Sequence, residues 1–161
     1  MTEAQRIVVA DLESTRRFAA ALAALLRPGD VVALSGELGS GKTELVRAMI
    51  RALAGSDVEV PSPSFALVQH YALPGLELWH ADLYRLSTPG EVAELGLEEA
   101  VERGAVVVEW PERAAGELPA DRLDLRLSFA PHLGENARIL ELRAGPSWRE
   151  RLAVLVERAG A

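Results

Sequence analysis

Residues 36–43 read Gly36-Glu37-Leu38-Gly39-Ser40-Gly41-Lys42-Thr43, which is the complete pattern G-x-x-x-x-G-K-[ST] of a phosphate-binding loop. Glycines permit backbone conformations that turn successive N–H groups inward around phosphate oxygens, and the positive end of the following helix adds to the attraction. Within this pattern Lys42 supplies a mobile cation and Thr43 a magnesium ligand. We therefore interpret the loop as a site for a nucleoside triphosphate.

The segments on either side of the loop have the character that such a site requires. Residues 31–35 form a short apolar run that predicts a buried strand. Residues 42–54 predict a helix, because Leu45, Met49 and Leu53 recur at helical spacing before Gly55 ends the pattern. The alternative is a glycine turn that carries a lysine by chance. A strand before the loop and a helix behind it instead indicate the strand-loop-helix unit of an α/β protein.

Apolar runs and turn residues predict further elements along the chain. Pro74-Gly75 lies between two strand-like runs and is a hairpin signal, so we expect a mixed sheet rather than a purely parallel one. The expected fold is α/β, a P-loop NTPase-type mixed β-sheet flanked by helices. The expected strands are 6–10, 31–35, 65–73, 76–84 and 105–109, with an antiparallel pair in 121–143 around the loop 131–136. The expected helices are 14–26, 42–54, one from Thr88 toward Leu95, 97–103, and one from the capping box 147–150 to about residue 158.

Length and composition limit the kinds of protein this can be. The chain has 161 residues, of which 49% are hydrophobic and 25% charged, so we expect a single domain over residues 1–161. The absence of cysteine excludes disulfides, thiolate zinc sites and cysteine nucleophiles. A net charge of −7 argues against a broad phosphate-neutralising surface, so tight unaided binding to nucleic acid is not expected. Without a signal-peptide pattern or an apolar run long enough to cross a bilayer, we expect a cytoplasmic protein that does not bind membranes.

Two acids are candidates to complete a hydrolytic site. Glu109 follows the apolar run 105–108, and Asp82 follows residues 78–81. In open α/β sheets, groups beyond the carboxyl ends of strands lie beside the phosphate loop, where carboxylate oxygens suit magnesium. The alternative for either acid is a solvated charge at a strand end. Because no N-K-x-D or T-K-x-D element is present to recognise guanine, ATP is expected rather than GTP.

Other polar segments have weaker interpretations. Ser62-Pro63-Ser64-Phe65 suits a loop that changes conformation with a γ-phosphate, or an ordinary turn. His80 could act as an acid or base, although a lone histidine on a half-buried strand is more often structural. His70 and His132 are weaker candidates for acid or base chemistry. Trp79 and Trp148 are assigned to packing.

Several elements together resemble the bacterial TsaE family, the ATPase of tRNA threonylcarbamoyladenosine synthesis. The resemblance covers about residues 11–113, and its narrow signatures are H-x-D-L-Y-R-L and V-E-W-P. The matching elements are the loop 36–43, Ser62-Pro63-Ser64-Phe65, His80-Ala81-Asp82-Leu83-Tyr84-Arg85-Leu86, Leu95-Gly96 and Val108-Glu109-Trp110-Pro111.

The resemblance implies a small cytoplasmic P-loop ATPase that joins the TsaD and TsaB proteins. Their complex transfers a threonylcarbamoyl group to adenosine 37 of tRNAs that read codons beginning with A, so tRNA is reached only indirectly. ATP hydrolysis by this subunit would reset the complex rather than perform the transfer.

The resemblance also implies roles for individual residues. Lys42 would contact phosphate and act in catalysis, Thr43 and Glu109 would hold magnesium, and Asp82 would hold the metal or the catalytic water. Trp110 would belong to the adjoining functional surface, and residues 11–15 would approach the adenine. The implied nucleotide-binding residues are Leu12, Glu37, Leu38, Gly39, Ser40, Gly41, Lys42, Thr43 and Trp110.

Two positions depart from the family pattern. Glu44 stands where a second threonine is usual, and its carboxylate would repel phosphate if it faced the ligand. Ser64 stands where a threonine is usual and retains the hydroxyl.

Two other functions stay open. A free-standing small-molecule kinase would place phosphate on a metabolite without responding to partner proteins. A nucleotide-gated binding module would use ATP as a switch and would hardly hydrolyse it.

Overall fold

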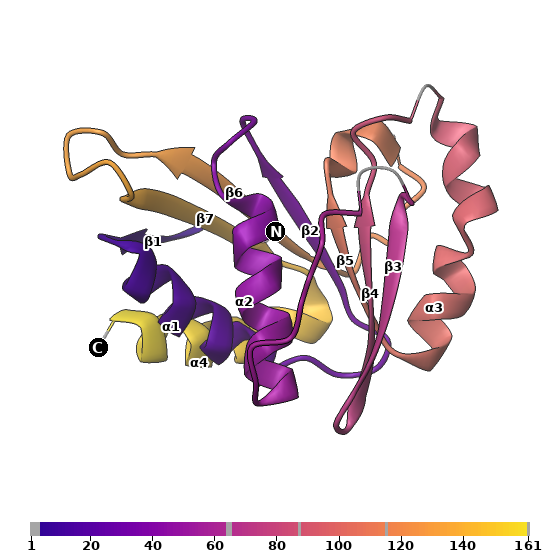
Figure 1. Ribbon diagram of the computed structural model, residues 1–161, viewed down its shortest axis with the longest axis horizontal. Coiled ribbons are helices and arrows are strands. Elements are labelled where there is room, and N and C mark those ends of the chain that lie inside the picture. Colours follow the sequence, from indigo (N-terminus) through magenta and orange to yellow (C-terminus); the bar gives the residue numbers. More distant parts are fainter. Residues whose placement is uncertain (1–3, 64–65, 87, 115, 161) are drawn as a thin grey trace.

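The structure is a computed structural model that describes residues 4–63, 66–86, 88–114 and 116–160. These residues form one mixed seven-stranded sheet in the order β1-β7-β6-β2-β5-β4-β3, with helices on both faces (Figure 1). The predicted α/β fold is therefore confirmed. The strands are β1 Gln5–Val9, β2 Val31–Gly36, β3 Val68–Leu73, β4 Leu76–Asp82, β5 Ala105–Glu109, β6 Leu123–Phe129 and β7 Arg138–Ala144.

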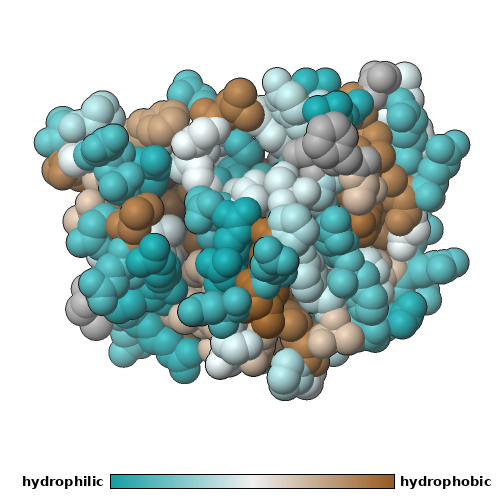
Figure 2. Space-filling view, in the orientation of Figure 1, coloured by the Kyte–Doolittle hydropathy of each residue, from teal (hydrophilic) through white to brown (hydrophobic). Residues whose placement is uncertain are grey.

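The helices divide between the two faces of the sheet (Figure 1). Helices α1, α2 and α4 pack on one face, and α3 with two 3₁₀ turns packs on the other. Hydrophilic side chains predominate on the surface in Figure 2, interrupted by small hydrophobic groups. Among the helices of the described chain, none has the length and apolar character that crossing a bilayer demands. The helices are α1 Leu12–Ala23, α2 Lys42–Ala54, α3 Leu97–Arg103 and α4 Arg149–Gly160, with 3₁₀ turns η1 Pro89–Leu95, η2 Pro111–Ala114 and η3 Pro146–Trp148.

The apolar runs of the central strands are continuous because both of their faces are buried. Strand β2 pairs in parallel with β5 and β6, and β5 pairs in parallel with β4. Side chains alternate between the faces of a strand, so Val32 and Leu34 join the core beneath α1 and α2, whereas Val31 joins the core beneath α3. The same alternation places Val107 and Glu109 of β5 on the α2 side.

Several predicted boundaries differ from the structure. The strand predicted over 76–84 ends at Asp82, the strand predicted over 6–10 is Gln5–Val9, and the helix predicted over 14–26 ends at Ala23. Helix α1 starts at Leu12 because the Asp11 carboxylate caps it, accepting a 2.8 Å hydrogen bond from the Ser14 N–H. The strand predicted over 65–73 begins only at Val68, because residues 66 and 67 form a turn, and Phe65 lies outside the described residues. The segment predicted as a helix from Thr88 toward Leu95 is the 3₁₀ turn η1.

The capping box expected at 147–150 is wrong. The Ser147 N–H and hydroxyl both donate to Asp121 Oδ1 at 3.0 Å, so this serine bonds to the segment before β6 rather than capping a helix. Ser147 lies within η3, and α4 begins at Arg149.

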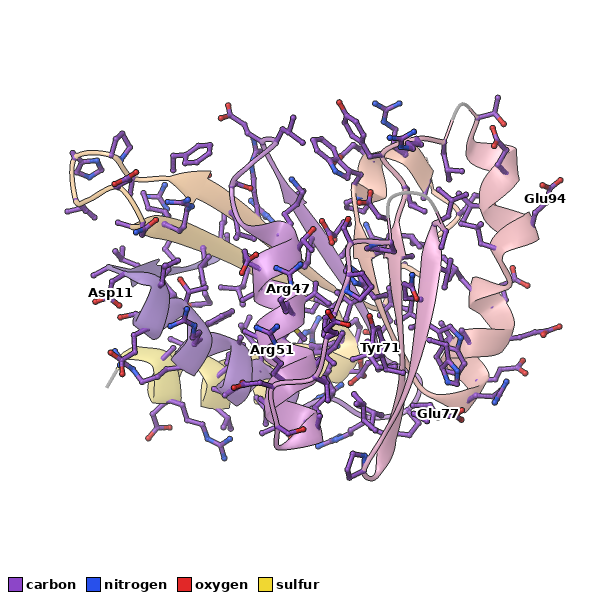
Figure 3. All side chains as sticks on the ribbon, viewed as in Figure 1. Asp11, Arg47, Arg51, Tyr71, Glu77 and Glu94 are labelled. Atoms are coloured by element: carbon purple, nitrogen blue, oxygen red, sulfur yellow. The ribbon has the colours of Figure 1, made fainter. Side chains whose placement is uncertain are left out.

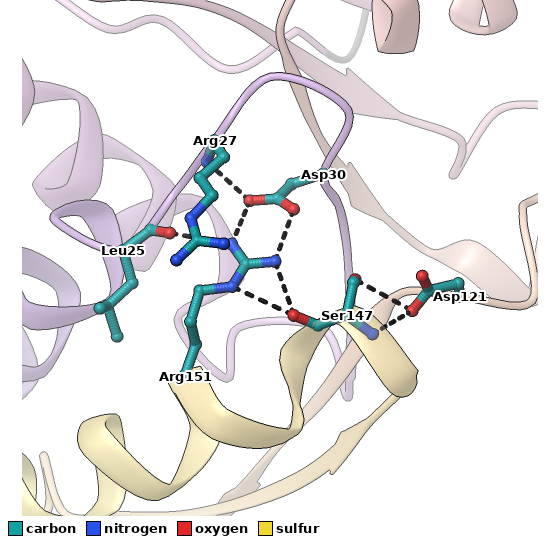
Figure 4. A network of polar contacts seen from close by, with 6 residues as sticks. All are labelled: Leu25, Arg27, Asp30, Asp121, Ser147 and Arg151. Atoms are coloured by element: carbon teal, nitrogen blue, oxygen red, sulfur yellow. Dashed lines mark hydrogen bonds and ion pairs between the residues drawn. The ribbon is translucent and has the colours of Figure 1, made fainter.

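A buried ion pair fixes α4 to the segment that enters β2 (Figure 4). Arg151 donates to both carboxylate oxygens of Asp30 at 2.6 and 2.9 Å, and both side chains are buried. Arg151 also donates to the Leu25 carbonyl at 2.9 Å, and Asp30 accepts from the Arg27 N–H at 2.7 Å. The start of β2, which leads to the phosphate loop, is thereby tied to the C-terminal helix.

Candidate functional site

Three parallel strands end together at the edge of the sheet that carries the phosphate loop. Leu34 of β2 pairs with Glu109 of β5, and Asp82 of β4 pairs with Glu109 on the other side. The loop leaves β2 at Gly36, and α2 begins at Lys42. The structure therefore brings Glu109 and Asp82 beside the loop, although 66 residues separate Thr43 from Glu109 along the chain.

The loop packs so closely against β6 that only glycine fits at its first position. Gly36 has φ 146°, and a Cβ there would lie 2.7 Å from the Leu127 carbonyl oxygen and 2.7 Å from Ser40 Oγ. Gly39 and Gly41 also have positive φ values, 81° and 106°. The buried Ser40 hydroxyl has no hydrogen-bond partner among the described residues. A cradle of backbone amides with a spare buried hydroxyl fits a group rich in acceptor oxygens such as a polyphosphate.

The Lys42 side chain is folded back onto its own loop. Only 5% of the residue is exposed, and Nζ donates to the Gly36 carbonyl at 2.6 Å and the Glu37 carbonyl at 3.1 Å. Nζ also lies 4.0 Å from the centre of the Trp110 ring. Burial lowers the pKa of Lys42, while the nearby carboxylates, Glu109 foremost, oppose that change. A phosphate would give this ammonium a stronger partner than two neutral carbonyls.

Thr43, Glu109 and His80 form a connected polar group behind the loop. Thr43 Oγ1 lies 2.9 and 3.0 Å from the two Glu109 oxygens. His80 Nε2 lies 2.5 Å from Glu109 Oε2. Glu109 is 2% exposed and His80 is fully buried. Asp82, 4% exposed, accepts a 3.0 Å hydrogen bond from the Tyr84 N–H.

This donor set fits magnesium held jointly with a nucleotide. Within the described part of the chain no three histidine, cysteine or acidic side chains are grouped as a metal site. A hydroxyl and one or two carboxylates are hard oxygen donors, and magnesium completes its shell with water and phosphate oxygens. Thr43, Glu109 and Asp82 are therefore the residues that could hold the ion.

A small pocket of about 300 Å³ lies over the loop. Trp110, which has φ 58°, forms part of its wall, and its ring centre is 4.9 Å from that of Tyr84. Ser62 also lines the pocket, while Ser64 and Phe65 of the predicted switch segment lie outside the described residues. The predicted site residues that line the pocket are Leu38, Gly39, Gly41, Lys42, Thr43, Asp82, Glu109 and Trp110.

Leu12 lies in a neighbouring groove instead. This groove has a volume of about 720 Å³ and is lined by α1 and α2, with Leu12 and Thr15 on one side and Arg47 and Arg51 on the other. Figure 3 shows both arginines extending from α2. Glu44 lines both the groove and the pocket over the loop, so the two hollows are neighbours.

Glu44 is engaged by a neighbouring side chain. It forms an ion pair with Arg47 one turn along α2, and Arg47 Nε donates to the Val60 carbonyl at 2.9 Å. The Glu44 side chain is 66% exposed. The ion pair compensates part of its negative charge next to the phosphate loop.

The remaining histidines and tryptophans lie as follows. His70 is exposed, bonds Glu77 at 3.1 Å and stacks on Trp79 with 4.4 Å between ring centres. His132 is exposed in the β6–β7 connection, and Trp148 is fully buried, as its assignment to packing predicted.

Sequence reasoning missed the contact of His80 with Glu109. Side chains alternate between the two faces of a strand, so His80 and Asp82 of β4 point to the same face. That pattern indicated that His80 could lie near the acid on the neighbouring strand. Only the register of two strands distant in sequence converts that signal into a contact.

Comparison with known proteins decides the family. Residues 9–137 match the family described as threonylcarbamoyl adenosine biosynthesis protein TsaE. The chain belongs to the TsaE family. The match includes the whole phosphate loop, His80, Asp82 and Glu109.

Individual TsaE relatives extend this likeness. A protein of Rickettsia bellii named tRNA threonylcarbamoyladenosine biosynthesis protein TsaE is 41% identical over 117 residues, which are 73% of this chain and 81% of the relative. A protein of the same name from Streptomyces coelicolor is 46% identical over 112 residues, 68% of this chain and 75% of the relative. The crystal structure of Bacillus subtilis YdiB superimposes with a TM-score of 0.80 at 28% identity, covering 100% of this chain and 99% of YdiB. The fold of this chain thus matches that of YdiB over its whole length.

Proposed function

We propose that this protein is the P-loop ATPase subunit of tRNA threonylcarbamoyladenosine synthesis. It binds ATP with magnesium and hydrolyses it to cycle a complex of TsaD and TsaB. That complex modifies adenosine 37 of tRNAs reading codons that begin with A. The family and the names of its relatives support the pathway. We infer a cytoplasmic location from the same pathway.

The observation that carries the ATPase proposal is the contact between Thr43 and Glu109. It joins the last residue of the phosphate loop to a buried acid on a neighbouring parallel strand at 2.9 Å. This is the arrangement in which a P-loop hydroxyl and a strand-end carboxylate together support a magnesium ion. A loop that only bound anions would not require a buried acid such as Glu109 beside Thr43.

Each residue has a distinct part in the proposed hydrolysis. The loop amides and Lys42 bind the β- and γ-phosphates, and the ammonium stabilises negative charge as the terminal phosphoryl is transferred. Glu109 and Asp82 orient the attacking water and, with Thr43, would hold magnesium. The ion would supply positive charge that offsets the negative charge of the phosphates. Trp110 and Tyr84 cover one side of the pocket and limit access of bulk water.

The small pocket supports hydrolysis coupled to a partner rather than phosphoryl transfer to a metabolite. Its volume of about 300 Å³ leaves little room for a second substrate beside a triphosphate. The neighbouring groove lined by Leu12 offers space for the base. We therefore assign the adenine to the side of α1.

Phosphate release from ATP and magnesium, measured with and without TsaD and TsaB, tests this function. We expect slow release by the isolated chain and faster release with the two partners. Phosphate on a metabolite with no response to the partners would support a kinase instead. A deficient complex whose repeated cycles are restored by a Glu109→Ala variant that binds but does not hydrolyse ATP would support the nucleotide switch.

A further inference from the structure

We propose that His80 is the positioning residue for Glu109: its Nε2–H holds one carboxylate oxygen and leaves the other to Thr43 and to the magnesium and water that would accompany the nucleotide. This inference rests on the proposed function and adds to it the device that orients the metal-side acid. From the sequence alone, a structural role is favoured for His80.

The contact is fixed by strand geometry on both sides. His80 is fully buried in β4, next to Val107 of the parallel strand β5. Two residues later Asp82 pairs with Glu109, so both β4 side chains face the same side as the Glu109 carboxylate. His80 Nε2 lies 2.5 Å from Glu109 Oε2, so the two groups are within hydrogen-bond reach.

The chemistry of the pair sets the direction of this bond. An ionised carboxylate only accepts, so we assign the proton to Nε2. The opposite ring nitrogen, Nδ1, is buried without a hydrogen-bond partner in the described regions. With the proton on Nε2, the atom left without a partner is Nδ1 as an acceptor. With the proton on Nδ1, the unsatisfied group would be a buried donor.

Thr43 alone cannot orient the acid. Its hydroxyl lies at nearly equal distances, 2.9 and 3.0 Å, from the two Glu109 oxygens and has one proton to give. His80 removes this ambiguity because it contacts only Oε2. Oε1 is then the oxygen available to Thr43, to magnesium and to water. Outer partners of this kind fix the orientation of metal-binding side chains.

Replacement of His80 by leucine removes the donor and keeps an apolar side chain in the strand. We expect hydrolysis to fall about 10- to 100-fold, the usual effect of losing an outer hydrogen bond at a metal site. Affinity for ATP measured in EDTA should stay unchanged, because the loop and Lys42 are intact. The gain in ATP affinity on adding magnesium should be largely lost.

Two further variants separate positioning from packing. His80→Gln places an amide donor near Nε2, so it should recover most of the magnesium-dependent gain that His80→Leu loses. His70→Leu is the matched control, because His70 is an exposed histidine on the adjacent strand β3 that contacts Glu77. It should behave as the parent protein. In a Glu109→Ala background, His80→Leu should have no additional effect on that gain.

Calorimetry of ATP binding to the full chain, with magnesium and with EDTA, is the deciding experiment. If the parent protein gains no affinity from magnesium, the proposed function fails before this inference is reached. If the parent gains affinity and folded His80→Leu gains the same, the positioning role is overturned. A folded His80→Gln that is as impaired as His80→Leu would also overturn it.

A spectroscopic measurement covers the case in which His80→Leu does not fold. In the parent protein labelled with ¹⁵N-histidine, the His80 ring should be the Nε2–H tautomer with a strongly deshielded ring proton. Glu109→Ala should remove that shift. An identical His80 signal in both proteins would contradict the inference.

Discussion

Glu109 is the residue at which the loop, the sheet and the buried histidine meet. Its carboxylate contacts both Thr43 and His80, so removing it should disrupt the metal side of the site while leaving the loop amides in place. We expect Glu109→Ala to abolish phosphate release while ATP still binds, measured by a release assay and calorimetry. Glu157→Ala, which removes an exposed acid on α4, is the control. Undiminished turnover in Glu109→Ala would end the assignment.

Gly36 tests whether the loop requires its close packing on β6. Gly36 and Gly29 both have positive φ, so alanine at either position costs about 1–2 kcal/mol of backbone strain. Only at Gly36 does the new Cβ meet other atoms, the Leu127 carbonyl and Ser40 Oγ. We expect urea unfolding to show a greater loss of stability for Gly36→Ala than for Gly29→Ala, with ATP binding lost only in the former. Equal losses would contradict the packing argument.

Single residues whose role follows from a local pattern could be predicted from the sequence. The phosphate loop is contiguous, and Glu109 and Asp82 each follow a strand-like stretch, so their meeting at one sheet edge follows from parallel pairing. The contact of His80 with Glu109 could not be predicted, because it depends on the relative register of β4 and β5. The engagement of Ser147 by Asp121 likewise involves residues 26 positions apart.

At the level of elements, the link between α4 and the start of β2 rests on one buried ion pair. Arg151→Met would leave the Asp30 carboxylate buried, with the Arg27 N–H as its partner, so we expect a loss of about 3–5 kcal/mol in unfolding free energy. Guanidinium unfolding measures it. Arg158→Met, at an exposed position of the same helix, should change stability little. A similarly small change in Arg151→Met would show that the ion pair does not fix α4.

The elements themselves were predictable where hydrophobic patterns are strong, and their ends were not. Strands β2 and β5 are continuous apolar runs because both faces are covered, and the Pro74-Gly75 hairpin joins β3 to β4 as expected. Helix ends depend on caps, so α1 begins at Leu12 under Asp11 rather than at residue 14. The capping pattern at Thr88 marks the start of η1 but does not specify whether the turns are 3₁₀ or α-helical.

The whole molecule carries a net charge of −7, which bears on how it meets tRNA. Phosphate backbones bind through positive charge and counterion release, and this chain has 24 acidic against 17 basic side chains. We expect no measurable tRNA binding by the isolated protein at physiological salt, using fluorescence anisotropy with labelled tRNA. Retention of tRNA should appear only with TsaD and TsaB. Tight, salt-sensitive binding by the isolated chain would contradict indirect contact.

The proposed ATPase activity requires that the cradle around Lys42 bind the phosphates of ATP, with magnesium at Thr43 and Glu109. Calorimetric titration of ATP into the folded protein, with magnesium and then with EDTA, measures this directly. We expect saturable binding that magnesium strengthens and that Lys42→Ala weakens severely. Absence of heat of binding in the parent protein, alone and with TsaD and TsaB, would contradict the central claim.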